Sequence, residues 1–288
     1  MTEKPKREND KPEKSEKTIV GKCEKGDKDS WSRDQREKGY YYDDSHGYEI
    51  YNPDEDEEEE EEEFKMKIKP LHDWNLSPAE AVQLQKQLAF EVVTYDDLEL
   101  PIKTVAGIDL GYDARNDISR AVVVVLSFPG LELLETAEAL LPIQFSYVPG
   151  LLSFRETPVA AKALEKLTLT PDLILCDGQG LAHPRRFGIA CHIGLIADVP
   201  TIGVAKSLLV GKFENLGQTR GSIAPLIHRN QQVGVALRTK DNVQPLFVSV
   251  GHRISLETAT EIVLQCAPKY RLPETTRLAD KLASYRKK

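Results

Sequence analysis

The stretch LILCDGQGLAHPRRFGIACHIG, residues 173–194, decides the fold of this chain. Its first four residues are apolar and are typical of a buried strand, which ends at Asp177. A turn with two glycines and a basic HPRR segment follows, and small and apolar residues then continue as in a helix. A buried strand that leads through a turn into a helix is typical of an α/β fold. The carboxylate at the strand end needs an explanation.

The sequence before this stretch predicts an antiparallel meander. Short polar or Pro-Gly turns separate three runs that are rich in aliphatic and β-branched residues. Strands joined by such short connections pair with their neighbours in the chain. The three runs are residues 102–112, 120–128 and 131–140.

Helices and strands alternate after the meander. Thr157 and Pro158 predict an N-cap and the first position of a helix, and Ser77 and Pro78 do the same near the start of the folded part. The resulting order predicts a ribonuclease-H-like α/β fold, a mixed β-sheet with helices on both faces. The predicted elements are a helix from about 78 to 94, a helix at 157–167, a strand at 171–177, a helix at 185–198, a strand at 200–206, a hairpin of 232–239 and 245–251, and a closing helix at 255–267.

Residues 1–70 differ in composition from the rest of the chain. They contain 15 Lys or Arg and 23 Asp or Glu, with ten consecutive acids at 54–63, and few aliphatic residues. Such a segment buries too little apolar surface to offset chain entropy, so we expect it to be disordered. Its charge of −8 equals the formal charge of the whole chain. The acidic isoelectric point therefore does not argue against a nucleic-acid partner.

The N-terminus and the cysteines bear on location. The first residues are rich in Lys and Glu and lack the apolar core of a signal peptide, and no apolar stretch reaches membrane-spanning length. These features predict a cytoplasmic protein without a membrane partner. Cys176 and Cys191 stand in apolar surroundings and are expected to be small buried hydrophobes.

Three carboxylates stand where chemistry is expected. Asp109 lies in the apolar run VAGIDL, Glu156 ends LLSFRE, and Asp177 ends the buried strand. An acid in an apolar strand is costly unless it is paired or binds a metal. If the first and fourth strands are neighbours, Asp109 and Asp177 face one point, and oxygen ligands without a Cys/His cage favour Mg²⁺. The alternative is that each acid pairs with an arginine or caps a helix.

Other residues allow a functional and a structural interpretation. The bare backbone of Gly178 and Gly180 lets N–H groups approach a planar or anionic ligand, or forms an ordinary turn. Lys206 ends an apolar strand as a fixed charge for a phosphate or as a side chain that extends to solvent. His183 alone favours loop packing over ligand binding, and Tyr147 is a stacking wedge or a surface residue.

Five segments, GIDLGY, YVPGLLSFRE, DGQGLAHPRRFGIACHIG, GVAKS and SVGHR, follow one another between roughly residues 75 and 285. Together they resemble the endonuclease V family in its bacterial form, which comprises DNA repair enzymes that act at deaminated adenine. The resemblance implies Mg²⁺-dependent hydrolysis, with Mn²⁺ as a substitute, of the second phosphodiester bond 3′ to deoxyinosine. The cut leaves 3′-hydroxyl and 5′-phosphate ends. It implies a catalytic domain over residues 71–288 that acts as a monomer on DNA containing deoxyinosine.

The resemblance also implies catalytic roles. Asp109 and Asp177 bind the metal, and Glu156 completes the acidic site. Lys206 and His252, which stand near strand ends, assist catalysis.

A second group of residues is implied to contact DNA. Tyr147 fills the gap that an extracted base leaves behind. Hypoxanthine differs from adenine by its O6 acceptor and N1–H donor, so fixed backbone groups on the glycine loop can distinguish the two bases. The basic residues of HPRR lie where phosphates pass. The implied DNA contacts are Tyr147, Pro149, Gly178, Gly180, His183, Arg185 and Arg186.

Three other interpretations stay open. An endoribonuclease of the same family, specific for inosine in RNA, differs by one contact to a 2′-hydroxyl. GIDLGYD and DGQG also resemble the phosphate loops of ribonuclease-H-like kinases, but those proteins need two such domains. A non-catalytic nucleic-acid-binding module has no use for converging acids without a metal.

Overall fold

The computed structural model describes residues 40–43, 47–50, 66–113 and 116–285. The chain divides into two units, Met1–Glu61 and Glu62–Lys288, which are considered separately. In the first unit, β1 (Tyr40–Asp43) and β2 (Gly47–Ile50) form an antiparallel ladder. The sequence predicts disorder for residues 1–70, whereas the structure has this ladder within that range. The other residues before 66 lie outside the described ranges, so their predicted disorder stays a prediction.

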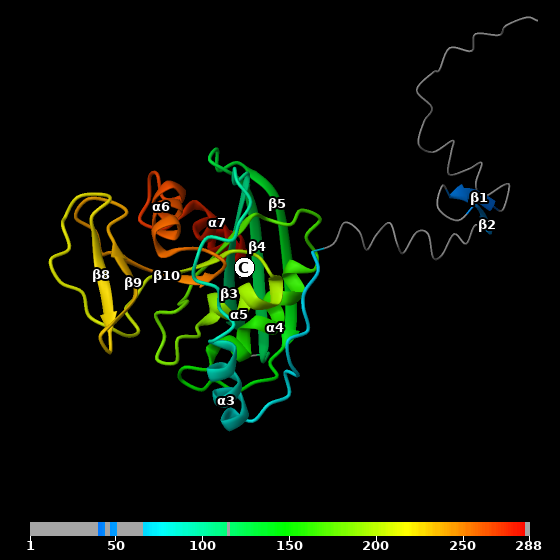
Figure 1. Ribbon diagram of the computed structural model, residues 1–288, viewed down its shortest axis with the longest axis horizontal. Helices are drawn as coiled ribbons and strands as arrows, with labels where there is room; N and C mark the ends of the chain where they lie inside the picture. Colours follow the sequence, from blue (N-terminus) through cyan, green and yellow to red (C-terminus); the bar gives the residue numbers. More distant parts are fainter. Residues whose placement is uncertain (1–39, 44–46, 51–65, 114–115, 286–288) are drawn as a thin grey trace, which may run out of the picture. The chain divides into compact units, whose positions relative to one another are not determined.

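The second unit is built on an eight-stranded sheet, whose strands are β3 (Thr104–Asp113), β4 (Ile118–Ser127), β5 (Leu133–Pro142), β6 (Leu173–Cys176), β7 (Thr201–Ala205), β8 (Ile223–His228), β9 (Gln231–Leu237) and β10 (Leu246–His252). The strand order is β5-β4-β3-β6-β7-β10-β9-β8. Figure 1 shows β3, β4 and β5 on one side of this unit and β8, β9 and β10 on the other. The first three strands form the predicted antiparallel meander, and β3, β6 and β7 run parallel. The last three strands continue the sheet with antiparallel pairing.

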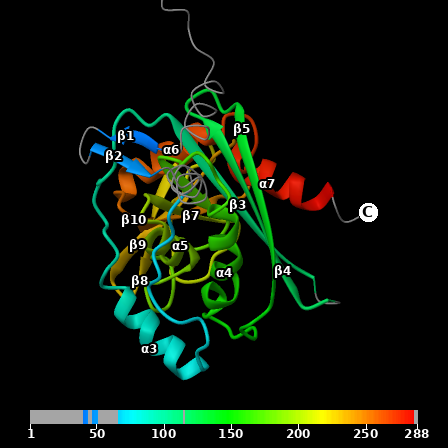
Figure 2. The ribbon, with the colours of Figure 1, turned by 90° about the vertical axis from the view of Figure 1, so that its right-hand side faces the viewer.

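The helices of the described part of this unit are α3 (Pro78–Leu88), α4 (Leu152–Leu164), α5 (Ile189–Ala197), α6 (Leu256–Cys266) and α7 (Glu274–Tyr285). The apolar residues of α4 and α5 share one core cluster with the sheet, and those of α6 and α7 share another. Figure 2 shows α4 and α5 in front of the strands, with α6 farther back. This arrangement confirms the predicted mixed sheet with helices on both faces.

Alternation along β3 explains why both faces are covered. Ala106 and Ile108 pack in the cluster with α4 and α5, whereas Val105 packs in the cluster with α6. Successive side chains of a strand point to opposite faces, so an apolar run such as this one is stable only when each face is covered. Gly107 fits the same rule, because a Cβ there would lie 2.4 Å from the backbone of Thr275, next to the start of α7.

Three helices differ from their predicted bounds. α4 begins at Leu152, so Thr157 and Pro158 lie inside the helix, and Leu151 takes the N-cap position without a side-chain hydrogen bond. α3 has the predicted Ser77 capping box but ends at Leu88 instead of 94, and α5 begins only at Ile189.

Two elements of the second unit were not predicted. β8 contains Pro225, which argues against a central strand but is tolerated in this edge strand. α7 follows α6, so the predicted closing helix is not the last one.

The packed unit includes residues that the sequence interpretation left in the N-terminal extension. Met66 is buried, and its N–H donates to the carbonyl oxygen of Leu167 at 3.3 Å. The N–H of Lys69 donates to the carbonyl oxygen of Ile196 at 2.7 Å. Residues 66–70 are therefore anchored to the sheet unit.

Further sequence expectations concern cysteines and membrane segments. Cys176 and Cys191 are buried free thiols, which confirms their prediction as small core residues. Among the described helices, each is too short or too polar to cross a membrane.

Candidate active site

Asp109 and Asp177 lie on neighbouring parallel strands. Ile108 of β3 pairs with Cys176 of β6, and the two aspartates are the next residues along their strands. Neighbouring strands are about 4.8 Å apart, so the two carboxylates share one region of the sheet. Both residues are partly exposed. The predicted juxtaposition of these acids is therefore present.

Glu156 approaches the same acids from α4. Burial is the main reason why the pKa of its carboxyl rises to about 7. The Arg155 charge opposes this rise, whereas the negative charges of Asp109 and Asp177 add to it. The guanidinium of Arg155 lies over the ring of Tyr112, 4.0 Å from the ring centroid. The three predicted acids thus interact electrostatically.

Lys206 follows β7 and pairs directly with one of these acids. Its Nζ lies 2.6 Å from Oδ2 of Asp177. Burial acts to lower the pKa of Lys206, but the hydrogen bond and charge of Asp177 raise it, as do the charges of Asp280 and Asp109. Lys206 therefore brings a positive charge to the acidic site, whereas its contact with a phosphate stays a prediction. Asp280 of α7 was not predicted, because nothing in the sequence shows that α7 returns to this part of the sheet.

The oxygen donors fit a hard divalent cation. Across the described residues, no three His, Cys, Asp or Glu side chains are gathered closely enough to enclose a metal ion. Mg²⁺ needs no such cage, because it binds through one or two carboxylates and keeps waters and substrate oxygens as its other ligands. Burial is the main cause of the raised pKa of Glu156, and the charges of Asp109 and Asp177 add to it, so a cation bound here would favour the ionised carboxyl.

A pocket of about 370 Å³ opens beside Asp177. Tyr147 reaches it from the loop before α4, Gly178 and Gln179 from the loop after β6, and Lys206 from the end of β7. Tyr147 is 62% exposed, so its ring is free to meet a ligand. Three segments that are distant in sequence therefore meet at one concave site next to the acids.

Two buried polar atoms in the pocket wall lack hydrogen-bond partners among the described residues. They are Oγ of Ser153 and Oε1 of Gln179. Nε2 of Gln179 donates to the carbonyl oxygen of Ser207 at 3.1 Å, which fixes the amide with its oxygen as the unpaired acceptor. An unpaired buried acceptor is costly and indicates a ligand with a donor. Neither side chain was predicted, because both residue types are common in loops.

The two glycines of the DGQG loop have different roles. Gly178 lines the pocket, as predicted. Gly180 is buried, and a Cβ there would lie 2.0 Å from the carbonyl oxygen of Val250. Its N–H donates to Oγ of Ser249 at 2.9 Å, and its carbonyl oxygen accepts from Gly188 at 3.0 Å. Packing and internal hydrogen bonds use its backbone, and it does not line the pocket, so a contact of Gly180 with a base stays a prediction.

The basic segment HPRR is built into the protein. Burial, followed by the charge of Arg185, lowers the pKa of His183 to about 4, so this pocket residue is neutral near pH 7. The guanidinium of Arg185 donates to the carbonyl oxygen of Gly150, and that of Arg186 donates to the ring and carbonyl oxygen of His228. These side chains hold loops together, and His183 offers no charge to a phosphate.

His252 lies away from the acids. It pairs with Thr201 at the start of β7, whereas Lys206 follows the end of that strand. At about 3.3 Å per residue, the length of the strand separates them by about 15 Å. The predicted catalytic role of His252 therefore does not fit the structure.

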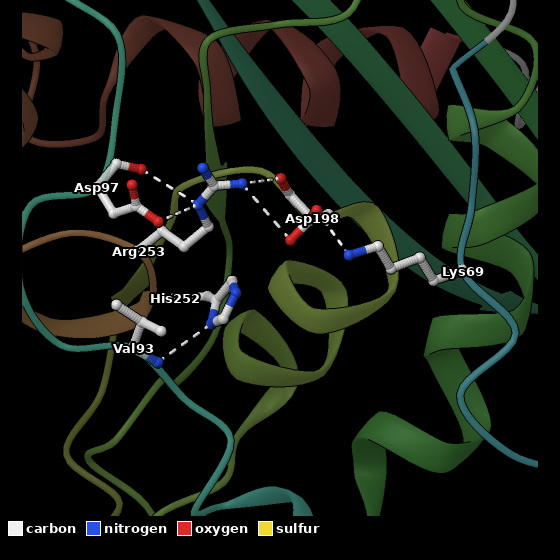
Figure 3. A network of polar contacts seen from close by, with 6 residues as sticks. All are labelled: Lys69, Val93, Asp97, Asp198, His252 and Arg253. Atoms are coloured by element: carbon white, nitrogen blue, oxygen red, sulfur yellow. Dashed lines mark hydrogen bonds and ion pairs between the residues drawn. The ribbon is translucent and has the colours of Figure 1, made fainter.

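His252 instead belongs to a polar network (Figure 3). Its Nδ1 accepts a hydrogen bond from the backbone N–H of Val93 at 3.2 Å. The neighbouring Arg253 contacts Asp97 at 3.0 Å and Asp198 at 3.5 Å. Burial lowers the pKa of His252 to about 4, which keeps the ring neutral. The network fixes the segment that links α3 to β3.

A ribonuclease-H-like sheet with carboxylates on two neighbouring strands and on the adjoining helix defines a class of metal-dependent nucleases. The family model of endonuclease V matches residues 86–281. The chain belongs to the endonuclease V family, whose members are nucleases.

Individual relatives agree with this assignment. The endonuclease V of Nostoc punctiforme is 58% identical over 219 residues, which cover 76% of this chain and 99% of the relative. The crystal structure of endonuclease V from Streptomyces avermitilis is 44% identical, with a TM-score of 0.70 over 77% of this chain and 96% of its own. Ciona intestinalis endonuclease V, in complex with a 24mer DNA containing an inosine followed by a ribo-adenosine, is 30% identical, with a TM-score of 0.63 over 72% of this chain and 96% of its own.

Proposed function

We propose that this chain is a DNA repair endonuclease that acts at deoxyinosine. It hydrolyses the second phosphodiester bond on the 3′ side of the lesion and leaves 3′-hydroxyl and 5′-phosphate ends. Mg²⁺ is the proposed cofactor, and Mn²⁺ is the proposed substitute.

The pocket beside the acids is the observation that carries this proposal. An extracted base in the pocket would lie next to Asp177 and Lys206, so recognition and cleavage would occur at adjoining places. The unpaired Oε1 of Gln179 is an acceptor that suits the N1–H of hypoxanthine, whereas adenine has no hydrogen at N1. Recognition of an extracted base through such edge contacts is typical of enzymes that act on a single base.

Each acidic-site residue has a proposed task. Asp109 and Asp177 would hold the metal, and Glu156 would complete the negatively charged site. Lys206 would bind a phosphate oxygen through its ammonium group, which already lies 2.6 Å from Asp177. A bound Mg²⁺ supplies positive charge to the scissile phosphate and lowers the pKa of a coordinated water.

Tyr147 has the proposed task of a wedge. Its exposed ring lines the pocket, and the exposed Pro149 follows it by two residues. The ring would fill the space of the extracted base and keep the neighbouring bases stacked. Stacking of a base on an aromatic ring contributes about 1–3 kcal/mol.

Cleavage of inosine in RNA is a second candidate activity. The nucleic acid bound to the Ciona intestinalis relative has a ribo-adenosine after the inosine. That observation supports a site that accepts a 2′-hydroxyl next to the lesion. A single contact to this hydroxyl distinguishes the two substrates.

Matched strands test the proposal. The protein is incubated with Mg²⁺ and strands of one sequence, as DNA and as RNA, each with inosine or adenine at one position. We expect one cut near inosine in DNA and none in the adenine strands. A cut only in the RNA strand would support the second candidate, and equal cutting at adenine would contradict both.

A cytoplasmic location and a monomeric state belong to the same proposal.

A further inference from the structure

Gln85 is a buried polar side chain that the proposed chemistry does not use. It belongs to α3, is 1% exposed and contributes to the pocket wall. Its Nε2 donates to the carbonyl oxygens of Gly150 at 3.1 Å and Phe187 at 2.7 Å. Its Oε1 accepts a hydrogen bond from Nε of Arg185. Both amide hydrogens and the amide oxygen are used, so one orientation of the side chain satisfies all three partners.

Gly150 receives a second hydrogen bond at the same carbonyl oxygen. Nη2 of Arg185 donates to it at 2.6 Å, so Gln85 and Arg185 both hold this carbonyl oxygen, and the ring of His183 interacts with the same backbone group. Gly150 has a φ of +82°, and a Cβ there would lie 2.6 Å from Nη2 of Arg185. Only glycine combines this backbone conformation with such a close approach. We call Gln85, Arg185 and the Gly150 carbonyl group the clamp.

The clamp holds the turn that directly follows Tyr147, and we call residues 147–151 the Tyr147 turn. The N–H of Leu151 donates to the carbonyl oxygen of Val148 at 2.9 Å and closes this turn. Tyr147 precedes the turn and is exposed, whereas Gly150 is held by the clamp. The turn is therefore fixed at Gly150 to α3 and to the loop after β6. The exposed ring of Tyr147 stands at its other end.

We propose that Gln85 and Arg185 are positioning residues that hold the Tyr147 turn in place for insertion beside an extracted base. This inference rests on the proposed function, because it needs a substrate with a gap for the ring. A fixed turn pays no ordering entropy when the ring enters the DNA, so the clamp increases affinity for lesion DNA without touching it. Its loss matters only while Tyr147 is present.

Hydrogen exchange in the DNA-free protein gives the first test. The Gln85→Met variant keeps the approximate volume of the side chain but removes all three hydrogen bonds. We expect peptides covering 145–152 to exchange roughly tenfold faster, as local opening becomes easier. Leu88→Ala is the matched control, because Leu88 is a buried residue of the same helix and is not part of the clamp. It should speed exchange in α3 and leave 145–152 unchanged. Unchanged exchange of 145–152 in Gln85→Met would overturn the clamp, whatever the protein does to DNA.

Binding to duplexes with and without inosine gives the second test. Gln85→Met should weaken binding of the inosine duplex roughly tenfold, and by less than about twofold when Tyr147→Ala is already present. Leu88→Ala should change binding of the inosine duplex by the same factor whether or not Tyr147→Ala is present. Equal factors for Gln85→Met in both backgrounds would overturn the link to Tyr147. If the parent protein does not prefer the inosine duplex, the proposed function fails, while the exchange experiment still decides whether the clamp exists.

Discussion

Glu156 is an acidic residue whose burial and acidic neighbours both oppose its ionisation. Its pKa lies at about 7 instead of 4.5, first because the carboxyl is buried and then because Asp109 and Asp177 are negative. Folding therefore favours the protonated form. As the pH rises from 4.5 towards 7, the unfolded chain ionises freely while the folded chain resists ionisation, so the free energy of unfolding falls.

A comparison of the parent with Glu156→Gln tests this effect. Without metal, we expect the variant to become more stable than the parent as the pH rises from about 5 to about 8, by up to about 3 kcal/mol at about 1.4 kcal/mol per pKa unit. Urea unfolding of both proteins at each pH measures it, and the difference cancels other titrating groups. Mg²⁺ should reduce the difference, because a cation stabilises the ionised carboxyl. A stability difference that does not change with pH would contradict the assigned pKa.

A variant of His252 tests whether this residue takes part in catalysis. In His252→Ala the N–H of Val93 loses its acceptor, so the free energy of unfolding should fall by about 1–3 kcal/mol. Cleavage at inosine should continue at a temperature where the variant is folded, because His252 pairs with Thr201, at the opposite end of β7 from Lys206. Chemical unfolding and cleavage rates measured on the same preparation separate the two effects. A folded variant that cuts roughly a hundredfold more slowly would restore the catalytic assignment.

At the scale of elements, the structure and the sequence prediction differ in the residue at which α4 begins, Leu152 in the structure and Thr157 in the prediction. Thr157 lies inside this helix, and its buried Oγ1 has no hydrogen-bond partner in the described part of the chain. Replacement of an unpaired buried hydroxyl by a methyl group removes a desolvation penalty. Removal of a true N-cap would instead cost about 0.5–2 kcal/mol.

Thr157→Val therefore has opposite expected signs in the two interpretations. With α4 as observed, we expect the free energy of unfolding to rise by up to about 1 kcal/mol. Thermal and urea unfolding of the parent and the variant measure this change. A loss of stability of about 1 kcal/mol or more would place the helix start at Thr157 after all.

The same comparison shows what sequence could reveal about this fold. The meander and the parallel strands were predictable, because apolar runs and their turns are local signals. The sequence assigns Glu156 to the site but predicts a later start for its helix, because Thr157-Pro158 is a strong local start signal. The buried face of α4 overrides that signal. His252 stands in a motif that resembles the family pattern, yet its role depends on which end of the sheet it occupies. That information requires the pairing of β10 with β7.

The role of Gln85 in the pocket wall could not be predicted from the sequence, because it depends on contacts between distant segments. Gln85 lies on α3, far in sequence from Gly150 and Arg185, which it contacts. A glutamine on an amphipathic helix is ordinarily a solvent-exposed residue. Only the packing of α3 against two loops makes it a buried hydrogen-bonding group.

At the scale of the whole molecule, charge is distributed unevenly along the chain. Residues 1–61 contain 12 Lys or Arg and 21 Asp or Glu. Like charges repel, so this segment should weaken binding of any polyanion to the protein, and salt should screen the effect. Met66 is packed on the sheet unit, so a deletion that ends at residue 61 spares the observed contacts.

Deletion of residues 1–61 should leave cleavage at inosine intact and tighten binding to undamaged DNA at low salt. The gain should shrink as the salt concentration rises towards physiological values, where the screening length is about 8 Å. Titration of a labelled undamaged duplex at several salt concentrations measures it, with the full chain as the control. Unchanged affinity at low salt, or loss of cleavage, would contradict this view of the N-terminal unit.

The central claim is that Asp109 and Asp177 together hold the metal that allows cleavage at inosine. The most direct measurement is the single-turnover cleavage rate of a DNA strand with one deoxyinosine, at increasing Mg²⁺, for the parent and the Asp109→Asn and Asp177→Asn variants. Mutation of residues that only support metal ligands lowers activity by about 10–100-fold. Because Asp109 and Asp177 are the proposed ligands themselves, we predict that each variant cuts at least about a hundredfold more slowly while its unfolding curve stays cooperative. A folded variant that cuts within about tenfold of the parent at the same Mg²⁺ concentration would contradict the claim.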